Sequence, residues 1–181
     1  MPRFLFILLA MFVAQLSVAQ EPNRADYSDI EDSRAEYLRA VESGNQHDIV
    51  TSRINLALVY WYSKSYNEAL THLKGAAATA CSIGDIKSEI NVNDYLSIIY
   101  SELQQYDEAL HFALEGVKLA RAASLYKEIV TSLINSAAVL MSQKNYNRAL
   151  EYIMEALDVA YSIKNNLLIC RCCQIASQIY A

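Results

Sequence analysis

Residues 66–70 read YNEAL, residues 106–110 read YDEAL and residues 146–150 read YNRAL. The three copies begin at positions 66, 106 and 146, so the motif recurs at one constant spacing. Self-similarity at a fixed period of roughly 20 to 50 residues is typical of repeat architectures, in which every unit is one supersecondary element. The chain is therefore predicted to be an array of repeats rather than a domain with a single central core.

Within each repeat the apolar residues recur with helical spacing. One stripe of the first repeat contains Val50, Ile54, Ala57, Leu58 and Trp61, and the next contains Ala69, Leu70, Leu73, Ala76 and Ala77. A repeat is thus predicted to be two antiparallel helices, which approach closely because a column of small residues lies at their crossing. The predicted helices cover residues 27–43, 47–63, 66–83, 87–103, 106–123, 127–143, 146–163 and 167–181.

The turns between these helices carry recognisable signals. Gly44 and Gly84 occupy equivalent places where a helix should end in the left-handed conformation. The candidate helix caps are Asn45, Asp85 and Asn165, with Ser124 as a substitute one residue early, and Ser65 with Glu68 as a capping box. The tyrosines that open the repeated motif, Tyr66, Tyr106 and Tyr146, are expected to fill the wedge at the turn.

The sequence resembles the tetratricopeptide repeat in the order of its marked residues, which are a small residue and then Tyr60, Tyr66, Ala69, Leu73 and Ala76. The resemblance covers about residues 27–181. It implies an all-α, right-handed superhelical solenoid of antiparallel helix pairs. Three full repeats would lie at about 47–86, 87–126 and 127–166, with half repeats at 27–46 and 167–181.

Two features depart from the family pattern. The spacing is about 40 residues rather than about 34, and the usual proline at the end of the second helix is replaced by Cys81, Arg121 and Tyr161. We interpret the extra residues as added length in both helices. HEAT and armadillo repeats have a similar length, but they usually carry prolines inside their helices, and this chain has none there.

The resemblance also implies a binding site, because the first helices of such repeats line a concave groove that holds a peptide or protein partner. The residues carried over to this groove are Asn55, Leu58, Trp61, Asp94, Tyr95, Ile98, Asn135 and Met141. Asn55 and Asn135 lie two repeats apart, and their amides could pair with the backbone of an extended peptide. A hydrogen bond to a neighbouring helix is the alternative role. The set contains no lysine or arginine, so a clamp for a terminal carboxylate is not expected.

Composition argues against other classes of function. The 15 Lys and Arg residues are scattered among 20 Asp and Glu residues, giving a net charge of −5, which disfavours a nucleic-acid partner. No metal, phosphate-loop, dinucleotide or serine-hydrolase motif occurs, so neither an enzyme nor a cofactor is expected. His47, His72 and His111 are interpreted as surface residues.

The cysteines allow two interpretations. Cys170, Cys172 and Cys173 cluster near the C-terminus, and a disulfide to an unseen helix is possible in an exported protein. The favoured interpretation places Cys170 in the core, because it shares a column with Val50, Ile90 and Val130. Cys81 is expected to be buried as well.

The first residues indicate export. An apolar run of eleven residues, Phe4 to Ala14, is shorter than a membrane-spanning helix, and Ser17-Val18-Ala19 offers small residues for a signal peptidase. We predict a signal peptide at 1–19, a linker at 20–26 and the repeat domain at 27–181, with an uncleaved anchor as the alternative. The protein would be periplasmic or extracellular, or tethered to a membrane if the chain is part of a longer one.

These observations favour an exported scaffold or sensor segment that binds a peptide or protein, and that could belong to a larger signalling protein. The alternative is a structural subunit that self-associates through its last helix. There the apolar residues expected to lack cover are Ile169, Cys170, Cys173, Ile175, Ala176 and Ile179.

Overall fold

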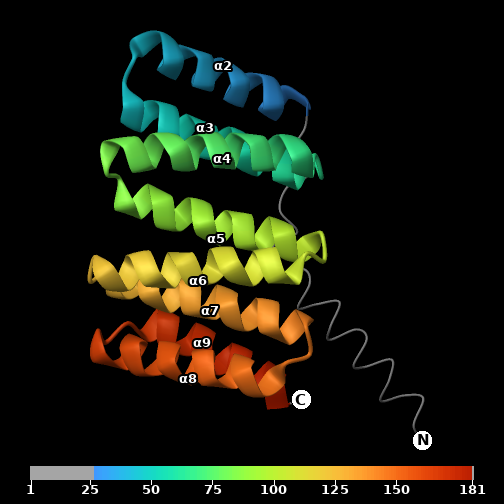
Figure 1. Cartoon of the computed structure of the whole chain (residues 1–181), viewed down its shortest axis with the longest axis vertical. Coiled ribbons are helices and arrows are strands. Elements are labelled where there is room, and N and C mark those ends of the chain that lie inside the picture. Colours follow the sequence, from blue (N-terminus) through green and yellow to red (C-terminus); the bar gives the residue numbers. More distant parts are fainter. Residues whose placement is uncertain (1–26, 181) are drawn as a thin grey trace, which may run out of the picture.

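The computed structural model describes residues 27–180, which form eight α-helices and no strand within that range. They are α2 (Tyr27–Ser43), α3 (Gln46–Tyr62), α4 (Tyr66–Ile83), α5 (Ile86–Glu102), α6 (Tyr106–Ala122), α7 (Tyr126–Ser142), α8 (Tyr146–Ser162) and α9 (Asn166–Tyr180). Every predicted helix is present, with its ends within one residue of the prediction. The helices stack one above the other in a single solenoid (Figure 1).

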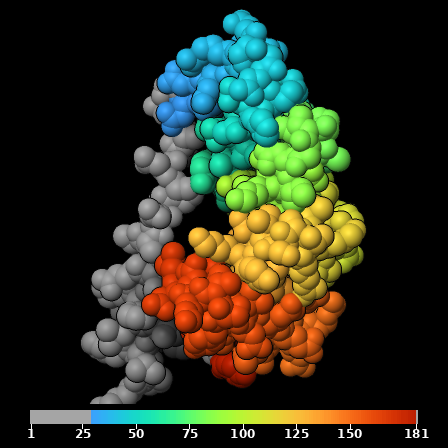
Figure 2. All heavy atoms as spheres, turned by 90° about the vertical axis from the view of Figure 1, so that its left-hand side faces the viewer, coloured from blue at the N-terminus to red at the C-terminus, as the bar shows by residue number. Residues whose placement is uncertain are grey.

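The helices form two rows. α3, α5, α7 and α9 contact one another in succession, whereas α4, α6 and α8 contact only the helices next to them in the described chain. We call α3, α5, α7 and α9 the inner row, and the side of it turned away from the other helices the inner face. Seen from the side, successive helix pairs form one continuous column (Figure 2). The first helices of successive repeats therefore lie side by side in one row.

Small residues at the helix crossings allow this close packing. Ala57, Ala69, Ala109, Ala137 and Ala149 are all fully buried. Larger side chains fill the space between neighbouring repeats, and the fully buried ones include Leu56, Leu73, Ile90, Leu133 and Ile153. Burying one such side chain stabilises the fold by about 1.5 to 3 kcal/mol, so each repeat depends on its neighbours for stability.

Seven turns of the described chain share one geometry at evenly spaced positions. Gly44 and Gly84 have φ of 70° and 67°, which confirms the predicted left-handed helix ends. The same conformation occurs without glycine at Lys64, Gln104, Ser124, Lys144 and Lys164. After Gly84 the amide of Asp85 donates to the carbonyl of Ala80 at 2.9 Å, closing a Schellman motif. Ser124 is therefore the left-handed residue and not the helix cap that the sequence suggested.

The other caps divide into confirmed and wrong predictions. Oδ1 of Asn45, Asp85 and Asn165 accepts from the backbone amides of the following helices at 3.1, 3.2 and 3.2 Å. Ser65 precedes α4 but makes no side-chain capping bond, so the capping box is wrong. The hydroxyl of Tyr66 donates to Glu102 at 2.9 Å in the next repeat, yet Tyr146 is 46% exposed and fills no wedge.

The cysteine predictions are largely wrong. Cys81 and Cys170 are exposed, whereas Cys172 is fully buried, and all four cysteines are unpaired in the structure. The residues equivalent to Cys170 in the earlier repeats, Val50, Ile90 and Val130, are fully buried. In each of those repeats a further helix follows the helix of the inner row. No helix follows α9 among the described residues.

His72 is not a surface histidine. Its ring stacks on Tyr60 with centroids 5.5 Å apart and lies nearly perpendicular to the ring of Tyr37, with centroids 5.7 Å apart. Burial, together with the nearby charges of Arg53 and Arg34, lowers the pKa of His72. The residue thus joins α4 to α2 and α3.

Between residues 27 and 180 no helix combines the length and the hydropathy needed to cross a membrane. The predicted signal peptide and linker lie outside the described residues.

Candidate functional site

The N-terminal half of the inner face carries a group of large apolar and aromatic side chains. We call Leu58, Trp61, Tyr62, Tyr95 and Ile98 the aromatic patch; all five are half-buried, so each exposes part of its surface. The rings of Trp61 and Tyr62 stack with centroids 5.1 Å apart. Burial raises the pKa of the Tyr95 hydroxyl, with smaller contributions from Tyr62 and Asp94, which shows that α3 and α5 bring these groups together. Four of the five residues belong to the predicted site.

The prediction is wrong for Asp94, which was expected to face the groove. Its side chain lies beneath the inner face with only 7% of the residue exposed. A Cβ at Gly116 of α6 would stand 3.3 Å from Oδ1 of Asp94 and 3.0 Å from Oγ of Ser132. Glycine at this position therefore leaves room for two polar groups between α5, α6 and α7.

Burial raises the pKa of Asp94 to about 6, although Ser132, Asn135 and the charge of Arg171 act in the opposite direction. Within the described chain, Oδ1 of Asp94 and Oγ of Ser132 form no well-directed hydrogen bond. A buried carboxylate that lacks full hydrogen bonding is costly, so folding shifts Asp94 toward its neutral form relative to the unfolded chain.

The two asparagines of the predicted site lie in different surroundings. Asn55 is exposed on α3, whereas Asn135 is only 9% exposed and lies beside Asp94. Asn55 can therefore present its amide to a ligand, whereas most of Asn135 is covered. For Asn135 the structure supports the alternative role as an internal hydrogen-bonding residue.

A hollow of about 450 Å³ lies between α7 and α9 on the inner face. The side chains that line this α7–α9 hollow are Ile134, Asn135, Ala138, Met141, Ser142, Arg171, Ile175 and Gln178. Asn135 and Met141 belong to the predicted site, but Arg171 does not. Arg171 occupies the same column as Thr51, Asn91 and Thr131, and continuing that column by one more repeat would have found it.

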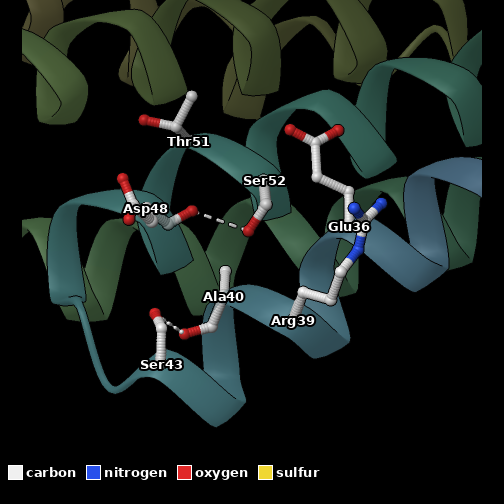
Figure 3. Close-up of a pocket in the computed structure, with 7 residues that line it drawn as sticks. All are labelled: Glu36, Arg39, Ala40, Ser43, Asp48, Thr51 and Ser52. Carbon is white, nitrogen blue, oxygen red and sulfur yellow. Dashed lines mark hydrogen bonds between the residues drawn. The ribbon is translucent and has the colours of Figure 1, made fainter.

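A second hollow, of about 290 Å³, lies between α2 and α3 (Figure 3). Two of its hydroxyl groups bond to backbone carbonyls of their own helices. The hydroxyl of Ser52 donates to the carbonyl of Asp48 at 2.7 Å, and the hydroxyl of Ser43 donates to that of Ala40 at 2.8 Å. Glu36, Arg39 and Asp48 give it mixed charge. Nowhere in the described range do three or more His, Cys, Asp or Glu side chains group to hold a metal ion.

The tetratricopeptide repeat family model matches residues 49–83 and 129–160, which lie in the first and third repeats of the solenoid. Together with the solenoid of helix pairs, these two matches identify tetratricopeptide repeats in this chain. The chain is a helical-repeat protein of the class that serves protein–protein interaction.

Three known proteins illustrate the similarity. Regulatory protein RapK of Bacillus subtilis (strain 168) is 27% identical over 111 residues, which cover 59% of this chain and 29% of RapK. BtubC (BKLC) from P. vanneervenii superposes with a TM-score of 0.74 at 16% identity, covering 84% of this chain and 65% of that one.

The third is a Signal Transduction ATPase with Numerous Domains protein with a tetratricopeptide repeat sensor, from Pyrococcus horikoshii. It gives a TM-score of 0.71 at 18% identity, covering 84% of this chain and 24% of that one. Both structural matches show the fold alone. The chain spans less than a third of RapK and of the Pyrococcus protein.

Proposed function

We propose that the chain binds an extended peptide or a protein segment along its inner face and serves as the sensing part of an exported protein. The observation that carries the proposal is the aromatic patch, which leaves large, flat side chains only partly covered on the side where successive inner helices meet. Tryptophan and tyrosine anchors of this kind dominate the binding energy of many protein interfaces.

The chemistry of the inner face suits a peptide in extended conformation. The exposed amide of Asn55 can donate to and accept from a peptide backbone, while Trp61 and Tyr95 provide surfaces for alternate side chains. Farther along, the α7–α9 hollow offers room for a further side chain. We also propose that the protein binds rather than catalyses.

Two relatives support a sensing or regulatory role. RapK is a regulatory protein, and the Pyrococcus protein contains a tetratricopeptide repeat sensor. The apolar run Phe4 to Ala14 and the small residues Ser17 to Ala19 support export. The sensing surface would then face the periplasm or the exterior.

Selection from a phage-displayed library of random dodecapeptides against residues 20–181 tests the binding proposal. Trp61 is the single tryptophan of the chain, so its fluorescence reports occupation of the aromatic patch. Selected peptides should change this fluorescence and lose at least about tenfold in affinity when Ile98 becomes aspartate. The matched control is Met154→Asp on α8, an exposed apolar residue that is 49% exposed. Peptides that bind both variants equally well would contradict the proposal.

Self-association through α9 is a second candidate, favoured by exposed apolar residues on that helix. Leu167 is 79% exposed and Tyr180 is 75% exposed. If α9 forms an interface, sedimentation should show a dimer that the change Leu167→Glu dissociates. A monomer at about 100 μM would exclude a standard interface, which binds in the micromolar range or tighter.

A further inference from the structure

The α7–α9 hollow has one charged residue in its lining. Arg171 is exposed on α9, and its guanidinium forms no hydrogen bond or ion pair with any described residue. The remaining lining residues are uncharged. A group entering the hollow therefore meets a single positive charge among amide, hydroxyl and apolar side chains.

A second polar group lies directly behind this lining. Asp94 is more than nine-tenths buried, its Oδ1 lacks a hydrogen-bond partner, and its charge interacts with that of Arg171. Asn135 connects the two, because it lines the hollow and lies beside Asp94. The charge that an anion meets in the hollow thus depends on the protonation state of Asp94.

The surroundings of Asp94 leave few other charges to consider. α6 faces it with Gly116, and α7 faces it with Ser132 and Asn135, none of which is charged. Arg171 on α9 and Tyr95 on α5 are the ionisable groups that interact with it. α3 and α4, which also pack against α5, contribute no charge to its environment.

We propose that the α7–α9 hollow binds the carboxylate of an acidic side chain within a peptide, through Arg171, and that the buried carboxyl of Asp94 controls the affinity. This proposal rests on the proposed function, since it names the kind of peptide that the inner face accepts. Neutral Asp94 leaves Arg171 free for the ligand. Ionised Asp94 competes for Arg171 and repels the incoming carboxylate.

The dependence on pH follows from linkage. The pKa of Asp94 is about 6, so the group is mostly neutral at pH 5.6 and about 97% ionised at pH 7.5. A glutamate side chain of ordinary pKa, about 4.3, stays ionised at both pH values. If only the neutral form of Asp94 admits the carboxylate, affinity rises by up to about 20-fold on acidification. Partial competition gives a smaller ratio, and we expect at least about threefold.

The test uses blocked amino acids as probes and does not require a natural ligand. N-acetyl-glutamate N-methylamide carries the side-chain carboxylate between peptide bonds, and N-acetyl-glutamine N-methylamide is its uncharged match. The signals of the Arg171 Nε–H and of the Asn135 and Gln178 amides are followed by NMR on the chain 20–181 up to about 100 mM probe, a range suited to a single weak contact. The blocked glutamate should shift these signals, with at least threefold tighter binding at pH 5.6 than at pH 7.5.

Two substitutions separate the roles. Arg171→Gln changes an exposed side chain and should abolish the shifts at both pH values, whereas Arg148→Gln on α8 should leave them intact. Asp94→Asn should give the same tight binding at both pH values, and circular dichroism checks that this variant folds.

The proposal is overturned if the blocked glutamate binds no better than the blocked glutamine. It is also overturned if binding is independent of pH in the wild type. N-acetyl-glutamine, which has only a terminal carboxylate, overturns the assignment to a side chain if it binds more tightly than the blocked glutamate. Failure here with successful peptide selection on the aromatic patch would leave the proposed function intact.

Discussion

Replacing Asp94 with asparagine should make the protein less sensitive to pH between 4.5 and 7.5. The pKa of Asp94 rises from 3.8 in the unfolded chain to about 6 in the folded one, mainly because the carboxyl is buried. The unfolded state therefore loses its proton first as pH increases. The contribution of Asp94 to folding stability is largest below pH 3.8, falls as pH rises, and reaches its lower plateau above pH 6.

The size of the effect follows from the two pKa values. A difference of about 2 pKa units corresponds to about 3 kcal/mol, of which about 2 kcal/mol is lost between pH 4.5 and pH 7.5. An asparagine at this position carries no charge, so it avoids this loss. The free energy of unfolding of Asp94→Asn minus that of the wild type should be about 2 kcal/mol larger at pH 7.5 than at pH 4.5.

Urea unfolding followed by circular dichroism measures this double difference, in which the pH dependence of all other groups cancels. Amide hydrogen exchange in α5 and α7 provides a local measurement, which is useful because repeat arrays can unfold in parts. Asp158→Asn, an exposed aspartate on α8, is the matched control. A stability difference between wild type and Asp94→Asn that is the same at both pH values would refute the assigned burial of the carboxyl.

Three further predictions concern the turns, the histidine and the N-terminus. Gly84→Ala should lower stability by about 1 kcal/mol and Gln104→Gly should raise it by up to about 1 kcal/mol, measured by urea unfolding, because both positions have positive φ. The lowered pKa of His72 favours its neutral form in the folded state, so hydrogen-exchange protection in α2 should fall as pH drops below 6.5. The His72→Phe variant should lose less of this protection. Protein from an exporting host should begin at Gln20 on N-terminal sequencing, and a mature chain that retains Met1 would remove the export proposal.

The fold could be predicted almost completely from sequence because the repeated motif fixes the register of every helix pair. Small residues recur where helices cross, and apolar stripes recur at helical spacing, so the helix bounds follow within one residue. The left-handed ends at Lys64, Gln104 and Lys144 could not be predicted. Lysine and glutamine carry no preference for positive φ, and only their even spacing from the glycines hints at them.

The candidate site could be predicted only in part. Helical spacing correctly placed Leu58, Trp61 and Tyr95 on the inner row, but it could not tell which residues of that row are covered by the next helix. That depends on how closely α5 and α7 approach, and this approach buries Asp94 and most of Asn135. The role of Gly116 could not be predicted from the sequence, because the side-chain atoms for which it leaves room come from Asp94 on α5 and Ser132 on α7.

Photo-crosslinking in the cells that naturally make the protein tests most directly whether the inner face is the binding surface. A photoreactive benzoylphenylalanine placed at Tyr95 reports on the aromatic patch, and the same residue placed at Met154 reports on the outer row. We predict a discrete crosslinked product from position 95 that is absent from position 154 and is lost when Ile98 is also changed to aspartate. Crosslinking from position 154 alone, or from position 95 regardless of the change at Ile98, would contradict a peptide site on the inner face.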